Sequence, residues 1–198
     1  CNNMYIHDIE FDTQVKNGDG IDFRKGCSHG LVENISGACS DDVVACTALL
    51  KEGNHYPARK YVFPMQVGGG ADSPLGNTVE SIEIRNIRAS SIHHVIICLA
   101  AGGAKVRNIT IQDIEDNMRR EATNIVAVYT GYGEAAHLGD MENIHLKNMI
   151  SNNSSVALKI NAPLRNCSFE NIEQRKGDGI AYEITSPYDK QMINVRIF

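Results

Sequence analysis

The residues Ile82-Glu83-Ile84-Arg85-Asn86-Ile87 decide the fold, because the same phrase recurs along the whole chain. It alternates apolar and polar residues, and an Asn or Asp directly precedes its last apolar residue. The last residues of the six copies are Ile9, Ile35, Ile87, Ile114, Met149 and Ile172. These anchors lie 26, 52, 27, 35 and 23 residues apart, which indicates an internal repeat of about 25 residues.

Each copy predicts one short β-strand, because apolar residues at every second position line one face of a strand. A second apolar segment follows each anchor and predicts a second strand in every repeat. These segments are 21–23, 43–46, 95–99, 125–129, 156–160 and 180–184. The copies are too far apart for tight hairpins, and no capped helical pattern separates them as a βαβ unit would require.

We therefore expect an all-β fold, a right-handed single-stranded parallel β-helix with coils of about 23–27 residues. A single domain should span residues 1–198. The separation of 52 residues predicts a loop insertion around residues 50–77, or one whole coil with weak patterning. The recurring Asn or Asp predicts an inward-turning corner with stacked amide groups.

The chain begins inside a repeat, which has a consequence for its first strand. An unpaired strand edge normally needs cover, so we expect further N-terminal coils, a cap or a partner in an oligomer. Any export signal would then also be missing from residues 1–198.

The composition restricts the partners. The 198 residues carry a formal charge of −5, which argues against nucleic acid, because phosphate binding needs clustered Lys and Arg. No apolar run approaches the ~20 residues of a membrane span, so no membrane partner is expected. The six cysteines lack the paired spacing of a zinc site, and we expect buried free thiols, with a disulfide from Cys27 to Cys39 or Cys46 left open.

A column of acids and histidines precedes the second strands. Residues at equivalent places in successive coils lie about 4.8 Å apart, so Asp19, the pair Asp41 and Asp42, and the pair His93 and His94 should share one patch. Repulsion between carboxylates raises the pKa of at least one of them. One acid can then donate a proton while another stays ionised, as glycoside hydrolysis requires. Adjacent strand residues point opposite ways, so Asp41 and Asp42 reach one cleft only if the chain bends there.

These motifs resemble glycoside hydrolase family 28, the polygalacturonase-like β-helices. The resemblance places the family's Asn-x-Asp-Gly turn at residues 17–20 and its Asp-Asp pair one coil later. It implies an inverting hydrolase without a metal or other cofactor, secreted or periplasmic, acting on pectin or a related carbohydrate polymer. Asp41 would be the general acid, Asp19 and Asp42 would hold the water as base, and Asn17 would contact substrate.

The resemblance also points to residues that bind substrate. The family's Gly-His-Gly segment falls on residues 92–94, where His93 and His94 follow an isoleucine. The family's Arg-x-Lys pair, which grips a uronate carboxylate, is absent from residues 125–128. Arg119 and Arg120 could replace it. Arg59 and Lys60 could also replace the Arg-x-Lys pair. Alternatively, the sugar is neutral and needs no such pair.

Two other functions stay open. The acids could bind Ca²⁺ in a polysaccharide lyase, with an arginine such as Arg24 as the base. Alternatively, the β-helix is a non-catalytic protein that binds glycans or serves as a structural spike, because fold alone does not fix chemistry.

Overall fold

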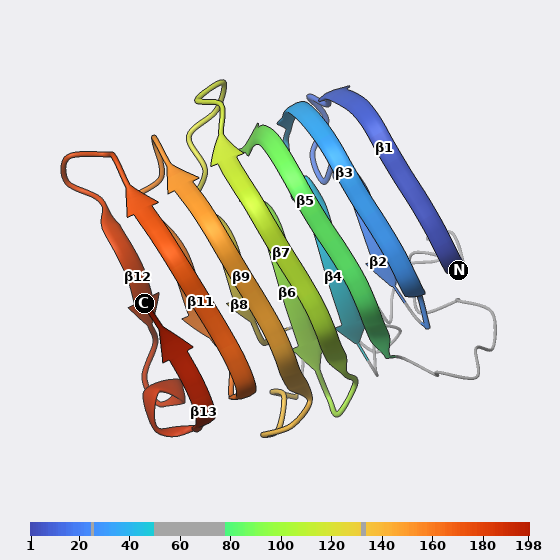
Figure 1. The fold of residues 1–198 in the computed structure, drawn as a ribbon, viewed down its shortest axis with the longest axis vertical. Coiled ribbons are helices and arrows are strands. Elements are labelled where there is room, and N and C mark those ends of the chain that lie inside the picture. Colours follow the sequence, from blue (N-terminus) through green and yellow to red (C-terminus); the bar gives the residue numbers. More distant parts are fainter. Residues whose placement is uncertain (25, 50–77, 132–133) are drawn as a thin grey trace.

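The computed structural model describes residues 1–24, 26–49, 78–131 and 134–198, and in them the chain forms two parallel β-sheets (Figure 1). The seven-stranded sheet holds β1 (Asn2–Asp12), β3 (Ser28–Cys39), β5 (Val79–Ser91), β7 (Val106–Asp116), β9 (Met141–Ser151), β11 (Leu164–Gln174) and β13 (Met192–Ile197). The six-stranded sheet holds β2 (Ile21–Arg24), β4 (Val44–Leu49), β6 (His94–Ala101), β8 (Asn124–Tyr129), β10 (Val156–Asn161) and β12 (Ile180–Ile184). A short 3₁₀ helix, Tyr188–Lys190, precedes β13, and no helix of the described residues is long and apolar enough to cross a membrane.

The chain alternates between the two sheets and advances by one strand at each return, as in a parallel solenoid. The strand register confirms the repeat. Ile9 pairs with Ile35, Ile35 with Ile87, Ile87 with Ile114, Ile114 with Met149, and Met149 with Ile172. All six predicted second strands are present in the smaller sheet, as β2, β4, β6, β8, β10 and β12. The strand β13 carries no copy of the phrase and was not predicted.

The 52 residues that separate the anchors Ile35 and Ile87 make up a single coil. β3 pairs directly with β5 and β4 pairs directly with β6, so neither sheet has a place for a further strand between them. The predicted insertion at residues 50–77 lies outside the described residues, as do Arg59 and Lys60.

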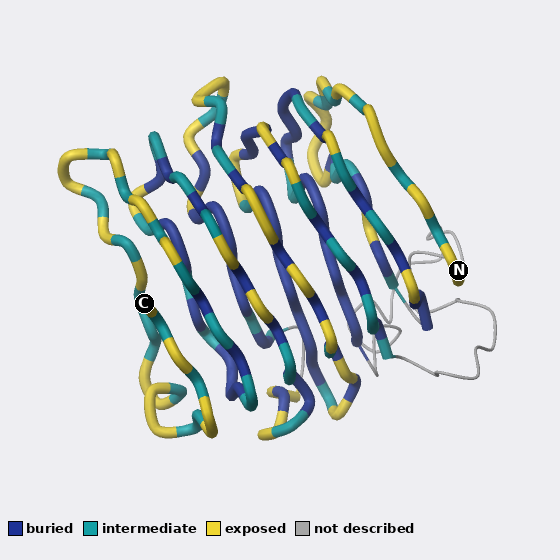
Figure 2. The backbone as a smooth tube through the Cα atoms, viewed as in Figure 1, coloured by how far each residue is buried: buried dark blue, intermediate teal, exposed yellow. Residues whose placement is uncertain are grey.

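The core lies between the two sheets and consists mainly of aliphatic side chains. Ile82, Ile84 and Ile87 of β5 are fully buried, while Glu83 and Arg85 between them are partly exposed, as the alternation predicts. The middle strands of the smaller sheet are buried on both faces (Figure 2). Cys27, Cys39, Cys46, Cys98 and Cys167 are buried free thiols, as predicted, whereas Cys1 is free but exposed, and the alternative disulfide is not formed.

The recurring Asn or Asp does not form an inward-turning corner, and that prediction was wrong. The six strands that carry the copies are 11–13 residues long rather than short, and with β13 they are called the long strands below. The recurring residues lie within these strands in the left-handed region, as Asn34 (φ 56°) and Asn86 (φ 52°) show, and their side chains are exposed or partly exposed. They do stack: Asn86 donates to Asn34 (2.6 Å) and Asn34 to Asp8 (2.9 Å). A second run joins Asn171 to Asn148 and Asn148 to Asp113. Asn is favoured because it tolerates positive φ and its amide both donates and accepts.

Candidate active site

The candidate site lies where the chain leaves the long strands and enters the smaller sheet. Ile21 pairs with Val44 and Val44 with Ile96, which places Asp19, Asp42 and His94 at the same point of three successive coils. The predicted column is therefore present.

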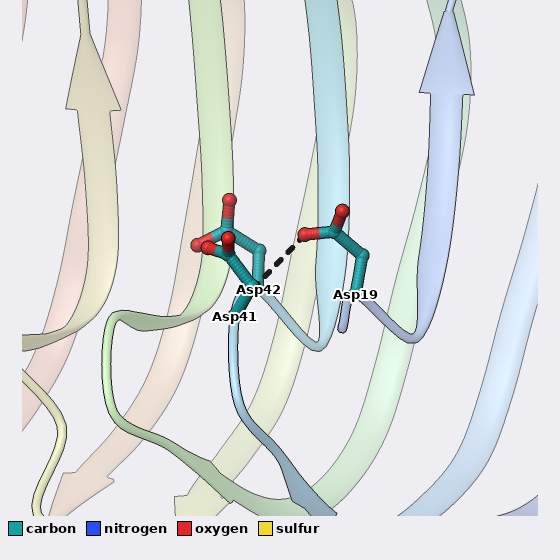
Figure 3. A group of neighbouring side chains, drawn as sticks. All are labelled: Asp19, Asp41 and Asp42. Carbon is teal, nitrogen blue, oxygen red and sulfur yellow. Dashed lines mark hydrogen bonds between the residues drawn. The ribbon is translucent and has the colours of Figure 1, made fainter. Parts of the chain in front are cut away.

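The three aspartates form one cluster (Figure 3). One carboxylate oxygen from each of Asp19, Asp41 and Asp42 lies within 4.8 Å of the other two, and all three residues are partly buried. The chain bends at residues 40, 41 and 43. This bend allows the adjacent acids Asp41 and Asp42 to share one patch, which a straight strand would prevent.

Hydroxyl groups fix the two loops that carry the acids. The Thr13 hydroxyl donates to the carbonyl of Gly18 (2.6 Å) and accepts from the backbone N–H of Ser40 (3.1 Å), so it joins the neighbours of Asp19 and Asp41. The Ser40 hydroxyl donates to the Val15 carbonyl. A Cβ at Gly18 would lie 2.7 Å from the Ser40 hydroxyl oxygen, so only glycine allows this close approach.

A third hydroxyl group links the acids to the histidines. The side chain of Ser91 is fully buried, donates to the Asp41 carbonyl and accepts from the backbone N–H of His93 at 2.9 Å. The sequence interpretation missed Thr13, Ser40 and Ser91. A signal existed, because each lies within one residue of the end of a long strand in three successive coils.

The cluster shifts the ionisation of two of its acids. Partial burial and the neighbouring carboxylates, chiefly Asp41, raise the pKa of Asp19 to about 7, although a hydrogen bond from the Asp42 backbone opposes this rise. Partial burial and the charge of Asp42 raise the pKa of Asp41, and the imidazoles of His93 and His94 partly offset that. Both shifts follow from placing like charges together outside bulk water.

The two histidines have different surroundings. His94 Nδ1 lies 2.7 Å from Asp42 Oδ1, and both side chains are mostly buried. His93 is exposed, and the two ring centroids are 6.3 Å apart. His94 is thus fixed against one acid, while His93 faces solvent near Asp41.

The remaining predicted residues lie around the cluster rather than in it. Asn17 is exposed in the turn before Asp19, with a positive φ of 57°. Arg119 contacts Glu10 at 3.1 Å and Arg120 lies 3.9 Å from Asp12, both acids of β1. The loop that carries these arginines therefore reaches from the fourth coil back to the first. Within the described residues, the ion pairs of both arginines are with β1 and not with the three aspartates.

The arrangement supports two kinds of chemistry. Three carboxylates with unequal ionisation can exchange protons with a substrate. Carboxylate oxygens at this spacing could also hold a divalent cation such as Ca²⁺. Arg24 forms an ion pair with Asp22, so it would have to leave this partner to act as the base of a lyase.

Comparison with known proteins adds no assignment: no protein-family model, curated protein or solved structure matches this chain.

Proposed function

We propose that this chain is a glycoside hydrolase of the polygalacturonase-like type, and that its parallel solenoid is a right-handed β-helix. The hydrolase proposal rests on the Asp19, Asp41 and Asp42 cluster, in which one oxygen of each lies within 4.8 Å of the others and the pKa of two is raised. Right-handedness is supported by the strong preference of parallel crossover connections for that hand. The substrate class is a carbohydrate polymer or oligosaccharide.

The proton for the leaving group comes from Asp41. A raised pKa lets the Asp41 carboxyl keep its proton at mildly acidic pH and donate it to the glycosidic oxygen as the C–O bond breaks. Water supplies the oxygen that bonds to the anomeric carbon, and the proton it loses passes to the base. One acid loses a proton and one base gains a proton, and exchange with solvent restores both.

Asp42 is the better base of the remaining pair. The resemblance to family 28 gives this role to Asp19 and Asp42 together. Asp19, with a pKa of about 7, carries a proton through much of the working range. Asp42 faces His94 at 2.7 Å, and this contact also fixes its orientation. In our proposal, Asp42 takes the proton from water and Asp19 donates a hydrogen bond to the same water.

Inversion of the anomeric carbon remains part of the proposal. Inverting pairs usually stand roughly 6.5–9.5 Å apart, so that water fits between a carboxyl and the sugar. The cluster is tighter, so the water would have to lie above Asp19 and Asp42 rather than between separated acids. NMR of the first product formed shows the anomer directly, and a retained anomer would exclude inversion.

The test is reducing-sugar release by the wild type and Asp41→Asn over neutral and uronate polysaccharides, with and without a calcium chelator. We expect activity that survives chelation and falls by about 10²–10⁴-fold in the variant. Activity lost on chelation would instead favour the calcium-dependent lyase, which the oxygen spacing also permits. No release from any substrate, with glycan binding intact in both proteins, would favour a non-catalytic β-helix.

A further inference from the structure

A second candidate binding site lies on the outer face of the seven-stranded sheet, far from the acids. An open trough of about 590 Å³ crosses the first halves of β1, β3, β5 and β7. Its lining includes Tyr5, His29, Leu31, Ser81, Glu83 and Asn108. The acids follow the opposite ends of these strands: Tyr5 and Asp12 are separated by most of β1, roughly 20 Å at the usual rise.

The trough follows a row of left-handed residues. Asn3, His29, Ser81 and Asn108 have φ of 55–57° and lie opposite one another across the four strands. The backbone of each strand therefore bends at the same level, and a polar side chain stands there at every rung. The rungs repeat at about 4.8 Å, close to the length of one hexose unit in an extended chain.

Tyr5 gives the trough a fixed aromatic wall. Its side chain is exposed (59 %), its hydroxyl donates to Glu33, and the ring of His7 stacks on it at a centroid distance of 4.2 Å. Tyr5 lines the trough, whereas His7 does not. Two neighbours hold the ring in place, which lowers the entropy lost when a ligand stacks on it.

The charges of the trough favour an uncharged ligand. Glu83 is the acid of its lining, and Arg85 pairs with it at 2.8 Å. The other polar groups are amides, hydroxyls and the His29 ring. Asn108 accepts from Asn143 at 3.0 Å through its oxygen, so its amide hydrogens remain available within the described residues. An aromatic ring beside neutral donors and acceptors suits sugar hydroxyls and the apolar face of a pyranose.

A second, smaller trough provides a comparison. It has a volume of about 240 Å³, lies over the row that contains Asn86, Asp113 and Asn148, and is lined by no aromatic residue. Arg88 and Glu115, an ion pair at 3.2 Å, belong to its lining. The bend in the strands is thus shared by both troughs, whereas the fixed ring and the larger volume belong to the first.

We propose that the Tyr5 trough binds a neutral oligosaccharide of extended shape, as a site separate from the aspartate cluster. The ring of Tyr5 stacks on one sugar, and the polar row formed by Asn3, His29, Ser81 and Asn108 contacts the hydroxyls of its neighbours. A site of this kind would hold a polymer on the solenoid whether or not the acids cleave it.

The test is an NMR titration of ¹⁵N-labelled Asp41→Asn chain with cellohexaose, xylohexaose and mannohexaose, and with the galacturonate hexamer as a charged comparison. The Asp41→Asn background limits cleavage during the measurement. We expect at least one neutral hexaose to shift the amide signals of Asn3, His29, Ser81 and Asn108, and to bind more tightly than the charged hexamer.

Variants then test the ring. Tyr5→Ala should weaken the affinity about tenfold, whereas Tyr5→Phe, which keeps the ring, should stay within about threefold. Tyr182→Ala is the matched control, because Tyr182 is similarly exposed (50 %) but lies on β12 of the other sheet. The proposal is overturned if no neutral hexaose shifts the trough amides, which needs no variant to fold, or if Tyr5→Ala binds as tightly as the parent. Either result leaves the hydrolase proposal untouched, because cleavage is measured separately at the aspartates.

Discussion

The backbone N–H of Asp42 donates to Oδ1 of Asp19 at 3.2 Å, although 23 residues separate them along the chain (Figure 3). This bond joins the loops of two successive coils and places a second and a third carboxylate beside Asp19. It only partly offsets the effects of burial and of the neighbouring charges, since the pKa of Asp19 still rises to about 7. The aspartate cluster therefore lowers the stability of the folded protein when its acids ionise.

Asp19→Asn should therefore stabilise the protein at alkaline pH. A raised pKa in the folded state means that the folded form holds a proton that the unfolded form releases, so wild-type stability falls as pH rises from about 4 to about 7. Asn cannot ionise and can still accept from Asp42. Urea unfolding should show a gain of about 1–2 kcal/mol at pH 8, reduced from the full shift because the side chain is partly solvated, and little gain at pH 4. A gain equal at both pH values would show that ionisation of Asp19 is not the cause.

The pH dependence of cleavage should report the same group. If Asp19 acts in its protonated form, kcat/KM of the wild type should fall as pH rises through about 7, and Asp19→Asn should lose that limb. The measurement is the initial rate at low substrate from pH 4 to 9. A wild-type rate that instead increases through pH 7 would assign Asp19 to the base.

The sequence predicted the repeat and the acids for one physical reason. A solenoid places equivalent residues of successive coils side by side, so residues one repeat apart in the sequence are neighbours in the structure. The pairings of Ile9, Ile35 and Ile87 show this. The same repeat places Asp19, Asp42 and His94 next to one another. Where the chain leaves this period, prediction failed.

The loop that carries Arg119 and Arg120 is such a place. Nothing in its sequence indicates that it reaches back to Glu10 and Asp12, because those contacts depend on the path of an irregular segment. The left-handed backbone of the recurring Asn and Asp residues was missed for a related reason. The alternation of apolar and polar residues indicates which face of a strand each side chain occupies, but it does not indicate the sign of φ. Thr13, Ser40 and Ser91 do recur at equivalent strand ends, but the groups that their hydroxyls bond depend on loop geometry.

Thr13→Val should disturb the acids without removing one. Valine has nearly the shape of threonine, but it leaves the Gly18 carbonyl and the Ser40 N–H without their partner, at a cost of about 1–3 kcal/mol. A looser loop would move Asp19 away from Asp41, so the pKa of Asp19 should fall toward its usual value. NMR titration of the Asp19 carboxyl carbon measures this shift, and Thr13→Ser, which keeps the hydroxyl, is the control. An unchanged pKa in the valine variant would mean that Thr13 only supports the fold.

Substitutions at Asn34 should show what the stacked Asn side chains on the long strands contribute to stability. Asn34 has a φ of 56°, donates to Asp8 and accepts from Asn86. Asn34→Val should cost about 2–3 kcal/mol, because a β-branched residue resists the left-handed region and both side-chain bonds are lost. Asn34→Gly loses the same bonds but adopts positive φ freely, so it should cost only about 1 kcal/mol. Urea unfolding of both variants separates backbone strain from amide stacking, and equal losses would mean that the stacked amides, rather than the backbone, select Asn at this position.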